Sequence, residues 1–184
     1  GDYLMVVKNN YFCLPNESKA GFIANGDQIV VKRIATIEEK HGFRFAKAEV
    51  NLVDYPDEPE FESFLLLDCI YVDKPSMSYD DSNRLYKSVE REYAYISTKY
   101  KRFQAIKADP YFNALQVKFA YAITCHKAQG GQWKNVFIEQ GYLPEPTVEK
   151  EYLRWLYTAF TRAIDTVYLI GFKPNFFSDE EVTK

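Results

Sequence analysis

The spacing of apolar residues changes twice along this chain, and that change limits the fold more than any other feature. The first seventy or so residues hold short apolar runs, among them Leu4–Val7, Phe43–Val53 and Phe61–Val72, with no helical spacing between them. Several short strands closed by tight turns predict a small β-barrel, which we place at residues 1–77.

One turn signal in this region predicts a hairpin. Asn25-Gly26-Asp27 stands between two apolar runs, residues 22–24 and 29–31. Asn and Gly tolerate the positive φ that a tight turn requires, so we expect the two runs to pair as neighbouring strands.

A single long helix is predicted after the barrel, in a connection that we place at residues 78–112. Apolar residues recur at intervals of three and four from Leu85 to Ile106, which is the spacing of one helical face. Ser78-x-x-Asp81 is an N-cap signal before this face, and Asp109-Pro110 is a stop signal after it.

The predicted helix carries a local excess of positive charge in a chain whose net charge is −3. Seven basic and two acidic residues lie between Arg84 and Lys107. The simpler interpretation is the solvated outer face of an amphipathic helix. The alternative is a basic arm that contacts phosphates, with nearby tyrosines as stacking groups, and the sequence leaves both open.

The last seventy residues have the pattern of an α/β fold. Leu115–Ile123 alternates in the manner of a strand, and Val136–Ile138 and Val167–Ile170 are shorter strand-like runs. Apolar residues from Val148 to Ala163 mark one face of a helix between the last two. The order strand, loop, strand, helix, strand predicts a right-handed crossover.

We place this α/β region at residues 113–175 and treat residues 176–184 as a tail. Glu149 and Glu151 lie in the first turn of its predicted helix, where they favour the positive end of the helix dipole. The tail contains Phe176-Phe177-Ser178-Asp179-Glu180, which looks like a strand ending in two carboxylates. It follows Pro174-Asn175, so we do not expect it to be such a strand.

The loop after the first of these strands has the residues of an anion or nucleotide site. It reads Thr124-Cys125-His126-Lys127-Ala128-Gln129-Gly130-Gly131-Gln132. Adjacent glycines can turn backbone N–H groups towards an anion, and Lys127 adds a positive charge. Ligands in open α/β sheets bind at strand ends, which is where this loop is expected. Taken alone, a Gly-Gly pair after a strand is also typical of a simple turn.

A second stretch, Tyr157-Thr158-Ala159-Phe160-Thr161-Arg162-Ala163, lies near the end of the last predicted helix. Arg162 stands beside the apolar face, so we expect it to project from the rim of the sheet layer. Its fork of donors suits a phosphate. The alternative is a surface ion pair with Asp165 or Glu151.

Together these two stretches resemble the last two conserved motifs of superfamily 1 helicases. The likeness is closest to the RecD-like (exodeoxyribonuclease V alpha-type), 5′→3′ branch and its UvrD-type C-terminal domain. Gly1-Asp2-Tyr3-Leu4-Met5, Asn9-Asn10-Tyr11 and Asn25-Gly26-Asp27 also resemble the start of that domain. The resemblance implies an α/β fold class: part of the second RecA-like motor domain of a P-loop NTPase, with an inserted small SH3-like β-barrel, whose first strand enters from the motor domain, and a long helix.

The resemblance also implies functional residues. Arg162 matches the arginine finger, which crosses the cleft between two RecA-like domains to the γ-phosphate of ATP. Gly130 and Gln132 match positions that contact the nucleotide, although many relatives have Glu at the position of Gln132. The positions that hold the backbone of single-stranded DNA are Thr124, His126 and Lys127.

Half of the expected active site is absent from the sequence. The chain contains no Gly-x-x-x-x-Gly-Lys-Ser/Thr, and in the family this phosphate loop and the magnesium carboxylate lie in the preceding domain. We therefore expect ATP and Mg²⁺ to bind the full-length protein and not this fragment, which should be inactive alone. The partners that the resemblance implies are single-stranded DNA, the missing N-terminal RecA-like domain, and other recombination or repair subunits.

Cysteine usage and apolar run length limit where the chain can work. The odd count of three cysteines, without a Cys-x-x-Cys pair, argues against a disulfide framework or a zinc site and for a reducing compartment, so we expect a cytoplasmic protein. The longest apolar run, Phe119–Ile123, is too short to span a membrane.

The sequence thus predicts the C-terminal fragment of an ATP-dependent DNA helicase or translocase that works in DNA repair or recombination. Two alternatives stay open: a non-catalytic β-barrel module that binds nucleic acid or protein, and an RNA helicase of the same superfamily.

Overall fold

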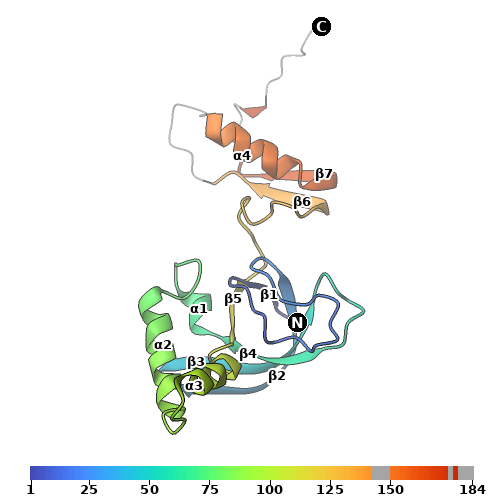
Figure 1. Cartoon of the computed structure of the whole chain (residues 1–184). Coiled ribbons are helices and arrows are strands. Elements are labelled where there is room, and N and C mark those ends of the chain that lie inside the picture. The colour runs from blue at the N-terminus through green and yellow to red at the C-terminus, as the bar shows by residue number, and fades with distance from the viewer. Residues whose placement is uncertain (142–149, 174–175, 178–184) are drawn as a thin grey trace. The chain divides into compact units, whose positions relative to one another are not determined.

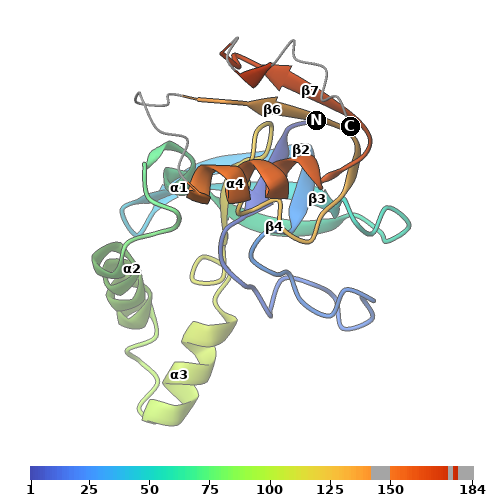
Figure 2. The same ribbon diagram turned by 90° about the horizontal axis from the view of Figure 1, so that it is seen from above.

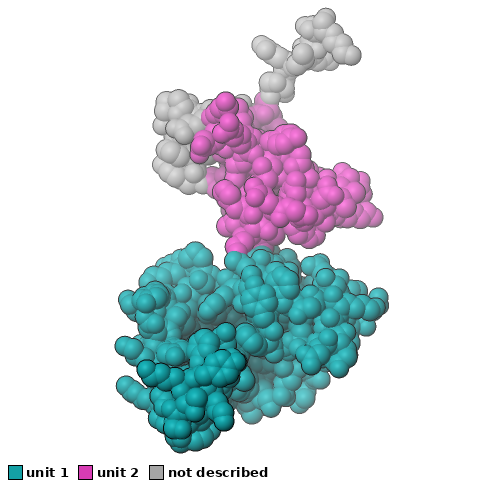
Figure 3. All heavy atoms as spheres, in the orientation of Figure 1, with its two compact units in different colours: residues 1–122 teal, residues 123–184 magenta. Residues whose placement is uncertain are grey.

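The structure is a computed structural model that describes residues 1–141, 150–173 and 176–177. The chain divides into two compact units, unit 1 (Gly1–Ala122) and unit 2 (Ile123–Lys184), which Figure 3 distinguishes by colour. Each unit is described by itself.

Unit 1 is built on a closed barrel of five strands (Figure 1). The strands, in barrel order, are β1 (Tyr3–Val6), β2 (Gln28–Lys40), β3 (Phe43–Leu52), β4 (Phe61–Leu66) and β5 (Leu115–Phe119). Neighbouring strands are antiparallel except β4 and β5, which pair in parallel. Alternate residues of these strands point inward and form an apolar core around side chains such as Val6, Ile29 and Val50.

The hairpin predicted between residues 22–24 and 29–31 is wrong. Residues around Gly26, whose φ is +111°, do form a turn. However, Ile23 bridges to Asn10, whereas Ile29 and Val30 pair with β1 and β3. The hairpin of this unit joins β2 to β3 instead. Its two-residue turn is His41-Gly42, with φ of 55° and 74°, and positive φ at both positions is what the turn type best suited to hairpins requires.

Three helices lie between β4 and β5, and the prediction of one long helix is wrong. They are α1 (Asp68–Tyr71), α2 (Tyr79–Glu92) and α3 (Lys99–Ala108). Ser78 caps α2 as predicted, because its side chain accepts a hydrogen bond from the Asp81 N–H. The chain turns after Glu92, and the Arg102 guanidinium donates to the Ile96 carbonyl, with Nη2 at 2.8 Å. That bond satisfies a backbone group which a continuous helix would have used internally.

The break between α2 and α3 lets both helices contribute to a second apolar cluster. Leu85 and Val89 from α2 and Ile106 from α3 pack there with Phe45 from the barrel wall and with the buried Cys69. The apolar spacing therefore indicated correctly that Leu85, Val89 and Ile106 are buried, but it did not indicate the turn between the two helices.

The boundary predicted at residue 113 also differs from the structure. We expected Leu115–Ile123 to begin the α/β region, but β5 completes the barrel by pairing with β1 and β4. Unit 1 accordingly extends to Ala122.

In its described residues, unit 2 contains two parallel strands and the α-helix between them. Strand β6 (Trp133–Glu139) pairs with β7 (Ala163–Ile170), and α4 (Lys150–Phe160) connects them and lies against one face of the sheet (Figure 1). Val148, Glu149 and Ser178–Glu180, which were discussed from the sequence, lie outside the described residues. Within the part of the chain that the structure describes, there is no helix with the length and apolar character needed to cross a membrane.

Candidate functional site

The loop that carries the first motif folds as a series of tight turns. The Thr124 carbonyl accepts hydrogen bonds from the N–H groups of Lys127 (2.9 Å) and Ala128 (3.1 Å). The Gly131 N–H donates to the Ala128 carbonyl at 3.2 Å, and Ala128 is buried beneath the loop. These N–H groups are therefore used inside the loop. The expectation that the paired glycines turn their N–H groups to an anion fails at Gly131.

Two neighbouring glycines stand at positions that disfavour a side chain, for different reasons. Gly130 has a φ of +90°, which L-residues with a side chain rarely adopt. A Cβ on Gly131 would lie 2.3 Å from the Trp133 ring, so the indole occupies the space that any larger residue would need. The loop is thus fixed by its own packing before any ligand arrives.

Arg162 lies one residue before β7, and its guanidinium points to this loop. Its Nη1 donates to the Gly131 carbonyl at 3.1 Å, its Nε to the Thr158 carbonyl at 3.1 Å, and its Nη2 to the Thr161 hydroxyl at 3.1 Å. The residue is half-buried. A guanidinium has five N–H donors, so two remain, one on each terminal nitrogen. That pair suits a bidentate contact with a phosphate or carboxylate.

Both motifs lie at the amino ends of the parallel strands. The Trp133 N–H, at the start of β6, donates to the Arg162 carbonyl at 2.9 Å, just before β7 begins. The sequence argument relied on the strand ends of an open sheet, with Leu115–Ile123 as the strand before the loop. That argument is wrong, because β5 belongs to the barrel. What brings the two motifs together is the register of β6 and β7.

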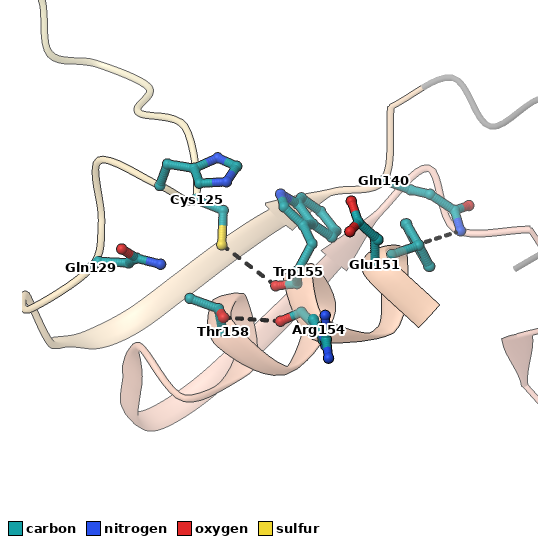
Figure 4. Close-up of a pocket in the computed structure, with 9 residues that line it drawn as sticks. Cys125, Gln129, Gln140, Glu151, Arg154, Trp155 and Thr158 are labelled. Atoms are coloured by element: carbon teal, nitrogen blue, oxygen red, sulfur yellow. Dashed lines mark hydrogen bonds between the residues drawn. The ribbon is translucent and has the colours of Figure 1, made fainter. Parts of the chain in front are cut away.

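A cavity of about 530 Å³ lies between the loop and α4 (Figure 4). Its lining residues include His126, Gln129, Glu151, Arg154 and Trp155. The volume falls within the range of sites that hold small molecules. The cavity therefore gives His126 a place on a concave surface.

Cys125 joins the loop to the helix beside this cavity. Its Sγ lies 3.4 Å from the Trp155 carbonyl oxygen, the contact drawn in Figure 4. Burial raises the pKa of the Cys125 thiol, and the positive charge of Arg162 offsets part of that rise. The thiol is thus held in its neutral form at pH 7, which makes it a weak nucleophile and a structural group.

The other residues that the sequence singled out are exposed. Thr124, Lys127, Gly130 and Gln132 lie on the surface of the same loop. The structure therefore collects all six predicted positions in unit 2, within one loop and the turn before β7. The ion pair between Arg162 and Asp165 or Glu151, offered as an alternative, is not formed among the described residues.

Sequence reasoning missed the groups that hold Arg162. Thr158 and Thr161 stand in the quoted stretch, yet nothing in their spacing shows that a carbonyl and a hydroxyl accept from the guanidinium. Gly131 was noted for its N–H, whereas its carbonyl makes the contact. Nothing in the sequence indicated that Glu151, Arg154 and Trp155 line a cavity, because a helix face that does so resembles any amphipathic face.

Part of the chain is similar to a known protein family. Residues 119–170 match the family model of the UvrD-like helicase C-terminal domain. The matched segment includes the loop, β6, α4, Arg162 and β7, and it supports a helicase family in the broad sense, that is, an enzyme class that hydrolyses ATP. No curated protein matches the chain.

Proposed function

We propose that this chain is a C-terminal part of an ATP-dependent DNA helicase or translocase in which Arg162 is the arginine finger. The observation that carries the proposal is the held guanidinium. Three protein acceptors fix it, and two N–H groups remain for an anion. A fixed cation of this kind stabilises charge that develops on a transferring phosphoryl group, because it needs no rearrangement at the moment of reaction.

The residues present fit one side of a nucleotide site. In this proposal Arg162, Gly130 and Gln132 face ATP, which supplies the phosphoryl chemistry when bound with Mg²⁺. The phosphate loop and the magnesium ligand belong to a preceding RecA-like domain, since this sequence contains no such loop. Unit 2 would then belong to the second RecA-like domain, with the barrel of unit 1 inserted into it.

In the same proposal Thr124, His126 and Lys127 hold the backbone of single-stranded DNA. They share a loop with Gly131, whose carbonyl accepts from Arg162. A shift of the loop on the strand therefore changes an acceptor of the arginine directly. This contact is a physical route by which ATP hydrolysis and movement along the strand could be coupled.

Finer assignments are part of the proposal and rest on the sequence resemblance. They are the RecD-like branch, a role in DNA repair or recombination within an exodeoxyribonuclease V-type complex, and a cytoplasmic location. The barrel is proposed as an element that guides the strand or supports a separating pin.

The decisive experiment replaces Arg162 in the longer protein that contains both RecA-like domains. We expect Arg162→Ala to lower the ATP turnover number by about 10³-fold or more, while DNA affinity stays nearly constant. Arg162→Lys should also be inactive, because lysine lacks the planar fork. Arg91→Ala, at an exposed arginine on α2 in unit 1, is the matched control and should retain activity.

Three results would contradict this assignment. Loss of DNA binding in Arg162→Ala, with circular dichroism unchanged, would move the arginine to the DNA site. Magnesium-dependent ATP hydrolysis by the 184-residue chain alone, abolished by Arg162→Ala, would show that the active site does not need a second domain. A chain that only binds nucleic acid or protein would show no effect of Arg162→Ala on any turnover.

A further inference from the structure

Helix α3 exposes aromatic side chains that the fold does not use. Ile106 is its buried residue, near the C-terminal end, and Figure 2 shows the rest of the helix extending away from the barrel. Tyr100 is 70% exposed and Phe103 is 44% exposed. Large rings on one short helix, without apolar neighbours to cover them, are a feature of binding surfaces.

A lysine lies on either side of these rings along one side of α3. A helix turns by about 100° per residue, so Phe103, Lys107 and Tyr100 fall within an arc of about 60°, with Lys99 about 40° further round. The Lys107 ammonium lies 4.6 Å from the centroid of the Phe103 ring. We call this surface, formed by Lys99, Tyr100, Phe103 and Lys107, the α3 strip.

The charge of the α3 strip is not neutralised by neighbouring acids. Four basic residues and no acidic residue lie within Lys99–Ala108. Among the described residues, Lys99, Lys101 and Lys107 take part in no ion pair. A locally positive surface on a chain of net charge −3 is complementary to a polyanion.

Hydrogen bonds and apolar packing hold both ends of the helix that carries the α3 strip. Before the helix, Arg102 closes the turn by donating to the Ile96 carbonyl from Nε (3.0 Å) and Nη2 (2.8 Å). After it, the Tyr93 hydroxyl donates to Asp109 Oδ2 at 3.0 Å and ties the end of α2 to the end of α3. Ile106 anchors the same end in the second apolar cluster. The exposed rings are therefore presented from a helix whose two ends are secured.

We propose that the α3 strip binds single-stranded nucleic acid. Tyr100 and Phe103 would stack on unpaired bases, and Lys99 and Lys107 would contact the phosphates between them. Interleaved rings and cations are how proteins hold single strands without reading their sequence. The inference takes its ligand class from the proposed function and adds a contact surface in unit 1 that is separate from the loop of unit 2.

The test measures binding of the 184-residue chain to a fluorescent oligothymidylate of about 16 nucleotides by anisotropy. Tyr100→Ala combined with Phe103→Ala should weaken binding by about 30-fold or more, because two rings each lose a stacked base. Lys99→Gln combined with Lys107→Gln should reduce the slope of log affinity against log salt by about 1.4, which corresponds to two phosphate contacts on a single strand.

Matched controls come from elsewhere in unit 1. Tyr71 is 71% exposed and Lys19 is exposed, and both lie outside the α3 strip. Tyr71→Ala and Lys19→Gln should leave the affinity and the salt slope unchanged. An abasic oligonucleotide of the same length should bind the double aromatic variant and the unaltered chain equally, because it offers no base to stack.

Each result decides the proposal. If the α3 strip variants bind oligothymidylate as the unaltered chain does, the α3 strip is not a nucleic-acid site. If the aromatic variant weakens abasic binding equally, the rings do not stack on bases and the inference fails as well. His126→Ala with Lys127→Gln tests the loop separately: loss there with unaffected α3 strip variants overturns only this inference, whereas the reverse pattern removes the loop from the proposed function and keeps the α3 strip.

Discussion

Unit 1 and unit 2 differ in how far each closes its own core. The barrel has no free sheet edge among its five strands, and side chains such as Phe45 and Val50 are completely buried. In the described part of unit 2, the buried apolar residues are Ala128, Ile138 and Ala159, of which two are alanines. The first unit has a core of its own, and the second has little of one.

The sheet of unit 2 leaves large aromatic side chains exposed. Consecutive strand residues point to opposite faces, and in β6 Ile138 is buried whereas Phe137 is 66% exposed. Phe137 stacks on Tyr168 of β7, with ring centroids 4.5 Å apart, and Tyr168 is 45% exposed. Two strands alone are marginally stable, so this sheet depends on the packing of α4 against one of its faces. The comparison teaches that the sheet of unit 2 exposes stacked aromatic side chains, whereas the barrel buries its largest ones.

The difference in packing between the two units can be tested by removing one aromatic ring from each. Phe45→Ala should lower the free energy of unfolding of unit 1 by about 3–5 kcal/mol, because it leaves a cavity in a closed core. Phe137→Ala should cost unit 2 of this chain only about 0.5–1.5 kcal/mol, the value of a ring pair at a surface. If the chain is part of the longer helicase proposed above, the cost of Phe137→Ala should rise there, since the proposed neighbouring strands would cover the ring.

The two units can be followed separately because both tryptophans, Trp133 and Trp155, lie in unit 2. Selective tryptophan fluorescence during urea unfolding reports on unit 2, and far-ultraviolet circular dichroism reports mainly on the larger unit 1. Equal costs for Phe45→Ala and Phe137→Ala in this chain would show that unit 2 is as well packed as the barrel.

A second prediction concerns the loop of unit 2, which depends on one close contact and not on a core. Gly131→Ala places a methyl group against the Trp133 indole and should destabilise unit 2 by about 1–3 kcal/mol through overpacking. Trp133→Leu in the same chain should relieve most of that cost. A Gly131→Ala chain whose unfolding midpoint does not move would show that the loop adjusts freely, against the fixed geometry described above.

The smallest expected effect concerns the stability of unit 1 at alkaline pH. Burial, the hydrogen bond to Asp109 and the negative charge of that carboxylate raise the pKa of Tyr93 to about 12, above about 10 for an unfolded tyrosine. The fold thus favours the neutral phenol, and this contribution to stability is complete below about pH 10 and is lost as the pH rises to about 12.

Tyr93→Phe should therefore flatten the loss of unit 1 stability over this range, as measured by circular dichroism. Tyr111 and Cys69 would supply part of the remaining dependence, because burial raises the pKa of both groups, that of Cys69 to about 11. Phe22 is half exposed and has no titrating group, so Phe22→Leu is a suitable control. An unchanged alkaline profile in Tyr93→Phe would mean that the contact with Asp109 does not persist in solution.

The sequence predicted those parts of the fold in which local pattern and tertiary structure agree. The Ser78 cap and the helix end at Asp109 depend on neighbouring residues in the sequence, so the sequence alone could predict them. The second half of β2, Arg33–Lys40, was missed because it is largely exposed on both faces and shows no alternation. The partner of Leu115–Phe119 was also out of reach, since the same alternation suits a barrel or a RecA-like sheet.

The candidate site was predictable in its residues but not in its contacts. The two motifs were found because their letters resemble a known family, and the register of β6 and β7 then places Arg162 beside the loop. The acceptor for Nη1 is a backbone carbonyl, a group that every residue carries, so no sequence pattern can indicate it. Likewise, the exposure of Tyr100 depends on the turn after α2, which the apolar spacing conceals.

The parallel pairing of β4 with β5 has a further consequence. Leu65 is registered with Leu115, so the chain leaves the barrel and returns to it at adjacent positions. Residues 67–114 are therefore an insertion with neighbouring ends, about 5 Å apart across the ladder. Such an attachment point accepts segments of different length and shape. The segment inserted here could therefore be replaced, during evolution or by protein engineering, with one that binds a different substrate.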